Sequence, residues 1–338
     1  MNFDFTDDQQ AIKRTARELL GDRFKPERVR ALAEAGEYDD GVWRELVELG
    51  WPGIYVPEEH GGQGLGLVEL VILCEELGYA LAPGPFLSNA AAGLLIQHGG
   101  SDEQRGRLMP GIAGGDPLAT FGERSGVSAV APDAGTAETV VVVEDGAAAS
   151  ATIQPASGAE RLDSIDSTRA LYRVQVADGE PLEGPAPGLH RARVALAAEL
   201  VGVAQRAMEM AVEHAREREQ FGRPIGAYQA VSHRCAQMLL EVEGARSATY
   251  YAAWAGDHEP ETLPLAASMA KAYASDAGAR VTSSALQVLG GIGFTWEHDL
   301  HFFLKRARAD AHLLGGARQH RDRVAELAGL PARDPASA

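Results

Sequence analysis

Three long apolar stretches in the second half of the chain most constrain its fold. The segment from Ala192 to Gly222 is amphipathic and predicts a helix of about 28 residues, roughly 40 Å long at 1.5 Å per residue. Residues 227–256 and 264–291 predict helices of similar length, and residues 296–314 predict a fourth. Long amphipathic helices joined by short polar turns imply an antiparallel bundle.

The residue pattern divides the rest of the chain into a helical first third and a β-rich middle. Apolar residues recur at helical spacing through the first third, where Phe5-Thr6-Asp7-Asp8 offers an N-cap and Asp40 and Gly50 mark the start and stop of a later helix. The middle has β-branched runs and turn residues without helical period. We therefore expect a mainly α protein with a small β domain, divided into an N-terminal helical domain (1–116), a small β domain (117–186), a four-helix bundle (187–330) and a flexible tail (331–338).

Composition excludes several classes of partner. The net charge of −17 argues against nucleic acid or an anionic membrane surface. The N-terminus is acidic and polar, which is unlike a signal peptide, and apolar runs fall short of the ~18 residues that span a bilayer. Two widely separated cysteines suit a reducing cytoplasm, where we expect the protein. His298 and His301 lie one turn apart without a third ligand in register, so we predict no metal site.

Two strings in the bundle are more informative than any single catalytic motif. They are "REREQFGRPIGAYQA" at 216–230 and "QVLGGIGFTWEHDLHFFLKRARA" at 287–309. Together with "PEEHGGQGLG" at 57–66 and the order of helical, β and bundle regions, they make the chain resemble the acyl-CoA dehydrogenase family of flavoproteins. The resemblance covers nearly the whole chain. It implies the family's fold: an N-terminal helical domain, a middle β domain (shortened here) and a C-terminal four-helix bundle.

The resemblance also implies an FAD site shared between subunits. A guanidinium suits a pyrophosphate because its planar fork donates to phosphate oxygens, and glycines let backbone N–H groups approach phosphate. In the family an aromatic ring lies against the adenine, and glutamine amides contact the nucleotide. The residues at the matching positions are Arg218, Phe221, Gln229, Gln287, Gly290, Gly291 and Gln319.

The family's catalytic base is missing from both places where it is expected. Its reaction removes the α-proton of an acyl-CoA thioester, which needs a carboxylate whose pKa is raised by an apolar pocket. In the commonest subgroup that residue follows the basic last helix, where this chain has Gly315. A second subgroup carries the base on the long helix, at the position of Ala192. Glu199 is two turns onward, ~10 Å along the axis, so we favour a packing role over a base.

The β region departs from the family pattern as well. The family has a Thr-Glu-Pro-like turn and a Trp-Ile-Thr-like strand beside the flavin ring. Here Glu123 is preserved, but Gly122 and Arg124 replace its neighbours, and no Trp occurs between Trp51 and Trp254. Residues for the ring half of the site are therefore mostly missing, while those for the adenine half are mostly kept.

This asymmetry predicts a subunit that works beside a different partner. The chain resembles most the base-lacking subunit of actinobacterial heterotetrameric acyl-CoA dehydrogenases of steroid side-chain degradation. That resemblance implies an α2β2 assembly with a homologous catalytic subunit, a shared FAD, an acyl-CoA substrate such as a steroid side-chain thioester, and electron-transfer flavoprotein or a similar acceptor. The alternatives are a self-sufficient homo-oligomeric dehydrogenase using Glu199 or Glu123, and a flavin-free binding or scaffold protein.

Overall fold

The computed structural model describes residues 4–146 and 149–330, so the tail predicted at 331–338 lies outside the described residues. Helices form the first third of the chain, as expected. Among the described residues, none of the helices is both long and apolar enough to cross a bilayer. The first third contains α1 (Asp7–Arg23), α2 (Pro26–Ala35), α3 (Asp40–Glu48), the short turns η1 (Trp51–Gly53) and η2 (Glu58–His60), α4 (Leu67–Tyr79), α5 (Phe86–Gly99) and α6 (Asp102–Gly114).

Side-chain caps set the starts of these helices. The Thr6 hydroxyl accepts a hydrogen bond from the Gln9 N–H at 3.2 Å, and the Gln9 side chain accepts one from the Thr6 N–H at 3.0 Å. The cap of α1 therefore lies within the predicted string from Phe5 to Asp8, at Thr6. The cap predicted at Asp40 is wrong by one residue. Asp39 caps α3, because its carboxylate accepts from the N–H groups of Gly41 and Val42 at 2.9 and 3.1 Å.

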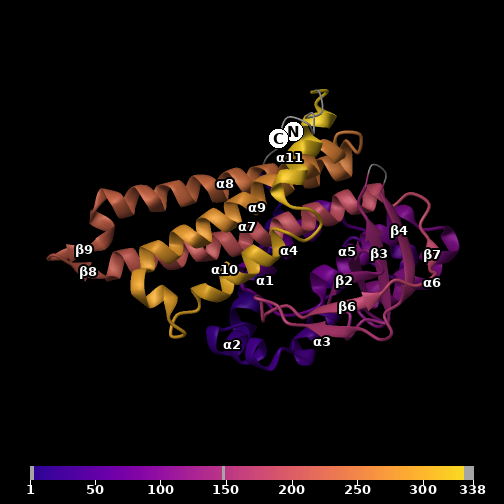
Figure 1. Cartoon of the computed structure of the whole chain (residues 1–338), viewed down its shortest axis with the longest axis horizontal. Helices are drawn as coiled ribbons and strands as arrows, with labels where there is room; N and C mark the ends of the chain where they lie inside the picture. Colours follow the sequence, from indigo (N-terminus) through magenta and orange to yellow (C-terminus); the bar gives the residue numbers. More distant parts are fainter. Residues whose placement is uncertain (1–3, 147–148, 331–338) are drawn as a thin grey trace.

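The middle of the chain folds into a seven-stranded sheet, at the right of Figure 1. Its strand order is β5-β6-β2-β1-β3-β4-β7. The central pair β1 and β3 is parallel, and the other neighbouring strands are antiparallel. The strands are β1 (Ala119–Ser125), β2 (Ser128–Pro132), β3 (Thr139–Glu144), β4 (Ser150–Pro155), β5 (Glu160–Leu162), β6 (Leu171–Gln175) and β7 (Glu180–Pro181).

Three long helices extend away from the sheet and form the bundle (Figure 1). They are α7 (Ala186–Glu217), α8 (Gln229–His258) and α9 (Leu263–Leu289). The hairpin of β8 (Glu219–Gln220) and β9 (Arg223–Pro224) joins α7 to η3 (Ile225–Ala227) and α8 at the end of the bundle far from the sheet. After α9, the turn η4 (Gly290–Phe294) leads to two shorter helices, α10 (Leu300–Asp310) and α11 (Ala317–Leu327).

The fourth bundle helix predicted over 296–314 is therefore shorter than expected. It begins at Leu300 and ends at Asp310. Leu314 and Gly315 then have φ values of +57° and +99°, a left-handed backbone that cannot continue an α-helix. The chain reverses there before α11 begins at Ala317.

Buried ion pairs join the sheet region to the bundle. Arg306 of α10 is 1% exposed and donates to Asp166 at 2.6 Å and to Glu199 at 2.5 Å. Arg169, beside β6, donates to Glu199 at 2.6 Å and also pairs with Asp310. Because a buried charge is strongly destabilising without its partner, these contacts fix α7 and α10 against the loop that precedes β6.

Candidate functional site

The turn between α10 and α11 contains the position where the family's base is expected. Gly315 occupies it with φ +99°. A Cβ built on Gly315 would lie 2.8 Å from Nε2 of His320 and 3.0 Å from Oε1 of Gln319. The positive φ therefore favours glycine here, and the side chains of His320 and Gln319 would have to move to admit a longer side chain.

A buried lysine holds this turn in place. Lys271 of α9 is fully buried, and its Nζ donates to the carbonyl oxygen of Gly315 at 3.0 Å. It also donates to the carbonyls of Asp310 and Ala311, both at 3.2 Å, and to the Ser275 hydroxyl at 2.9 Å. Burial lowers the pKa of Lys271 to about 8. Lys271 thus caps the C-terminus of α10, where a cation is favourable.

Glu123 of β1 contacts the same turn from the sheet. Its Oε1 accepts a hydrogen bond from the Leu314 N–H at 2.8 Å. Burial raises the pKa of Glu123, while this hydrogen bond and the charges of Lys271 and Arg193 oppose the rise. The carbonyl of Leu314 lies 3.2 Å from Nε of Arg193 and 2.9 Å from Nε2 of His320. Four ionisable side chains therefore surround the turn that carries the base in the family.

The second expected base position likewise has no side chain that could accept a proton. Ala192 is completely buried in α7. Glu199 lies farther along α7, where burial alone would raise its pKa, but the charges of Arg169 and Arg306 outweigh burial and hold the pKa below its ordinary value. A carboxylate bound by two guanidinium groups is a poor proton acceptor. The contacts of Glu199 support the packing role.

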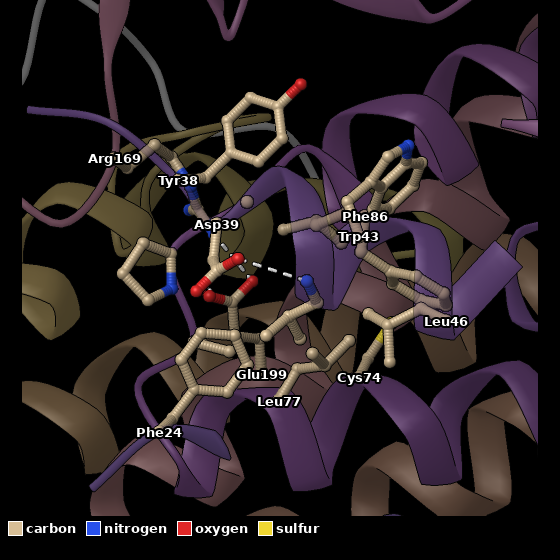
Figure 2. A pocket seen from close by; sticks show the side chains of 15 residues that line it. Phe24, Tyr38, Asp39, Trp43, Leu46, Cys74, Leu77, Phe86, Arg169 and Glu199 are labelled. Carbon is tan, nitrogen blue, oxygen red and sulfur yellow. Dashed lines mark hydrogen bonds and ion pairs between the residues drawn. The ribbon is translucent and has the colours of Figure 1, made fainter. Parts of the chain in front are cut away.

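The cavity beside Glu199 is too small for a substrate. Figure 2 shows Arg169 reaching toward Glu199 at one side of it, with Phe24, Trp43 and Leu77 among the side chains around it. Its volume of ≈ 20 Å³ is close to that needed for one water molecule.

The residues predicted for the adenine half of FAD gather at one end of the bundle, which we call the distal end (Figure 1). It comprises the β8–β9 hairpin, the start of α8 and the end of α9 with η4. Phe221 is 94% exposed there and has a left-handed backbone, with φ +52°. Six predicted residues lie at the distal end: Arg218, Phe221, Gln229, Gln287, Gly290 and Gly291.

Gln319, the seventh predicted residue, lies elsewhere. It is on α11, and its Nε2 donates to Asp145 at 3.2 Å. The neighbouring Gly315 is bonded to Lys271, which precedes Gln287 on α9 by 16 residues (287 minus 271). That separation is about 24 Å of helix. A single copy of the chain therefore does not bring Gln319 to the other six.

Of the four ionisable side chains around the turn, sequence reasoning singled out Glu123 and missed Lys271, Arg193 and His320. Lys271 carried the clearest signal, because it is the lone charged residue between Leu263 and Asp276 in an otherwise apolar and small-residue stretch. Arg193 and His320 carried no comparable signal, since each lies in a segment that contains other charged residues.

Comparisons with known proteins agree with this architecture. Residues 6–116 match the acyl-CoA dehydrogenase N-terminal domain, and residues 186–328 match the acyl-CoA dehydrogenase C-terminal domain. Over 320 residues the chain is 34% identical to acyl-CoA dehydrogenase IpdE2 of Mycobacterium tuberculosis, covering 93% of this chain and 95% of the relative. The chain belongs to the acyl-CoA dehydrogenase family.

Two solved structures resemble nearly the whole chain. One is a variant described as the Tcur3481-Tcur3483 steroid ACAD, with a TM-score of 0.84, 30% identity, and coverage of 96% of this chain and 98% of that one. The other is the ChsE4-ChsE5 complex from Mycobacterium tuberculosis, with a TM-score of 0.86, 25% identity, and coverage of 98% and 100%. Each of these two proteins is named for two components.

Acyl-CoA dehydrogenases bind FAD, and the donors at the distal end fit its nucleotide half. The side chains of Arg218, Gln229 and Gln287 are exposed and make no hydrogen bond or ion pair with another described residue. Gly291 has open space around its Cβ position, so packing within the described chain does not require glycine there. A guanidinium, two amides, an exposed aromatic ring at Phe221 and an uncrowded glycine backbone suit a pyrophosphate and an adenine.

Proposed function

We propose that this chain is the non-catalytic subunit of a heteromeric FAD-dependent acyl-CoA dehydrogenase. Its distal end would hold the adenine and pyrophosphate of an FAD whose ring lies in a homologous catalytic partner. When bound, FAD accepts the hydride in this class of reaction. The observation that carries the proposal is Gly315, which occupies the expected base position with a left-handed backbone and with the side chains of His320 and Gln319 close to its Cβ position.

The contrast between the two half-sites supports a partner. The distal end offers three polar side chains with no bonded partner in the described structure, so it is ready to bind a ligand from outside the chain. Around Leu314 and Gly315, by contrast, the backbone groups are already bonded to Glu123, Lys271 and Arg193. The distal end is therefore available to a ligand, whereas the backbone groups around Gly315 are already bonded within the chain. This contrast fits a chain that needs an unlike subunit in an α2β2 assembly.

The relatives suggest the substrate class. A structure described as a steroid ACAD matches nearly the full length of the chain, so we propose an acyl-CoA thioester with a steroid side chain as substrate. Electron-transfer flavoprotein or a similar acceptor would reoxidise the enzyme. Failure to bind FAD together with a partner would contradict the proposed subunit role. Failure to oxidise a steroid side-chain thioester would contradict only the proposed substrate.

The test is to isolate the chain from its native host, identify what accompanies it, and co-express the two. We expect flavin absorbance and dehydrogenation of acyl-CoA from the pair, and little of either from the lone chain. Arg218→Ala should lower the FAD content of the pair severalfold, because one charge-assisted phosphate contact is lost. Arg216→Ala is the matched control, since Arg216 is also an exposed, unbonded arginine in the last turn of α7. Strong turnover with stoichiometric FAD from the lone chain would contradict the proposal.

A self-sufficient dehydrogenase is the second candidate, and Glu123 favours it. This carboxylate is next to the expected base position, and burial raises its pKa, as a general base in this reaction requires. The hydrogen bond from the Leu314 N–H argues against it, because it occupies one carboxylate oxygen. If Glu123→Gln abolished acyl-CoA oxidation by the lone chain while FAD stayed bound, this second function would replace the first.

A further inference from the structure

A separate cavity opens between the N-terminal helices and the bundle. It lies among α1, α2, the end of α4, α7 and α10, with a volume of ≈ 320 Å³, and none of the residues predicted to bind FAD lines it. Pockets of roughly 300 Å³ and above are typical of small-molecule sites. Its apolar lining includes Leu20, Phe24, Val29, Leu81, Phe302 and Phe303, each less than 10% exposed.

Positively charged side chains lie at the rim of this cavity. Arg17 stacks over the ring of Tyr79 and pairs with Glu76, and Arg206 lies on the same ring and pairs with Glu213. Lys25 also lines the cavity; its side chain is exposed and makes no hydrogen bond or ion pair with another described residue. The Lys25 ammonium is therefore the cation at this rim that can bind an anionic group of a ligand.

The cavity wall includes a glycine that packing does not explain. Gly21 lies in the last turn of α1, three residues before the helix-capping Phe24, so it is not the terminating glycine. A Cβ at Gly21 would meet no atom within 4 Å. A helix-favouring side chain would fit sterically, yet glycine leaves this part of the cavity open.

We propose that this cavity binds an amphiphilic carboxylate: an apolar chain or ring system against the phenylalanine and leucine side chains, with its carboxylate at Lys25. Charge selects the occupant, since the one unbonded ammonium at the rim matches one carboxylate. Asp299 also lines the cavity, but it pairs with Arg30. A CoA thioester fits less well, because its carboxyl group is esterified and its several phosphate charges would meet Asp299 and the rest of an acidic protein. The site does not depend on the proposed FAD role.

The experiment is a calorimetric titration of the full chain, alone and with its co-purified partner. The probes are laurate, cholate, dodecanol and lauroyl-CoA. We expect saturable binding of at least one of the two carboxylates, and the comparison of laurate with cholate distinguishes a chain from a ring system. Dodecanol and lauroyl-CoA should bind at least about tenfold more weakly, and Lys25→Glu should weaken carboxylate binding by about tenfold.

Gly21→Phe is the decisive variant, because a ring at this position fills the cavity. It should abolish carboxylate binding without lowering the melting temperature. Gly106→Phe is the matched control: Gly106 is also an exposed helical glycine with no atom within 4 Å of its Cβ position, and it lies on α6, away from the cavity. Equal binding by wild type and Gly21→Phe, equal binding of laurate and dodecanol, or no binding of either carboxylate would overturn the proposal.

Discussion

Restoring a carboxylate at the expected base position should destabilise the protein rather than create an enzyme. In Gly315→Glu the new side chain must adopt φ near +99°, and its Cβ would lie 2.8 Å from the His320 ring nitrogen. Holding a non-glycine residue in such a sparsely populated backbone region costs about 1–3 kcal/mol. Movement of His320 would also weaken its contact with the Leu314 carbonyl, which is now 2.9 Å. We expect a loss of at least about 2 kcal/mol in the free energy of unfolding.

Gly316→Glu provides the matched control for this prediction. Gly316 has φ −79° and ψ 163°, which any residue adopts, and no atom lies within 4 Å of its Cβ position. Its unfolding free energy should change by no more than about 0.5 kcal/mol. Urea denaturation of both variants, followed by circular dichroism, measures the difference. If Gly315→Glu is as stable as Gly316→Glu, our account of the turn is wrong; if it becomes a fast homomeric dehydrogenase, our account of the β region is wrong.

Two further predictions concern the buried charges. Arg306→Met should lower the free energy of unfolding by about 3–5 kcal/mol, because Asp166 and Glu199 lose a buried partner, whereas the exposed Arg308→Met should change it by less than about 0.5 kcal/mol. Burial raises the pKa of Asp133 to about 6, so the folded state holds a proton that the unfolded state releases. The stability of wild type relative to Asp133→Asn should therefore fall by up to roughly 3 kcal/mol between pH 4 and 6; a constant difference across that range would contradict the raised pKa. Asparagine suits the test because it tolerates the φ of +55° at this position.

Local features of the fold were predictable because they depend on neighbouring residues. The Thr6 cap follows from a hydroxyl placed three residues before Gln9, and the long bundle helices follow from apolar spacing within each segment. Asp39 and Asp40 are adjacent and chemically alike, so the pattern could not choose between them. That choice depends on which residue has the extended backbone of a cap, and Asp39 does, with φ −91° and ψ 103°.

The surroundings of the expected base could not be predicted in the same way. The position of Gly315 followed from the motif register, but Lys271 precedes it by 44 residues, and Glu123 precedes Leu314 by 191. Contacts at such separations depend on how α9 and β1 pack against the turn, which no local pattern specifies. A lone lysine in an apolar helix indicates a buried partner without saying which carbonyls it binds.

Charged side chains from three parts of the fold surround the turn where the family's base is expected. If the chain had only lost its catalytic glutamate, we would expect an empty pocket beside Gly315. Instead the turn is held by Lys271 from the bundle, Arg193 from α7 and Glu123 from the sheet, and each charge is either paired or bonded to a backbone group. Buried charges are destabilising unless they are bonded in this way, so these three side chains stabilise the turn in its present form. A turn held by bonded charges, together with unbonded donors at the distal end, favours a subunit adapted to complete another chain's active site over an enzyme that has simply lost its own.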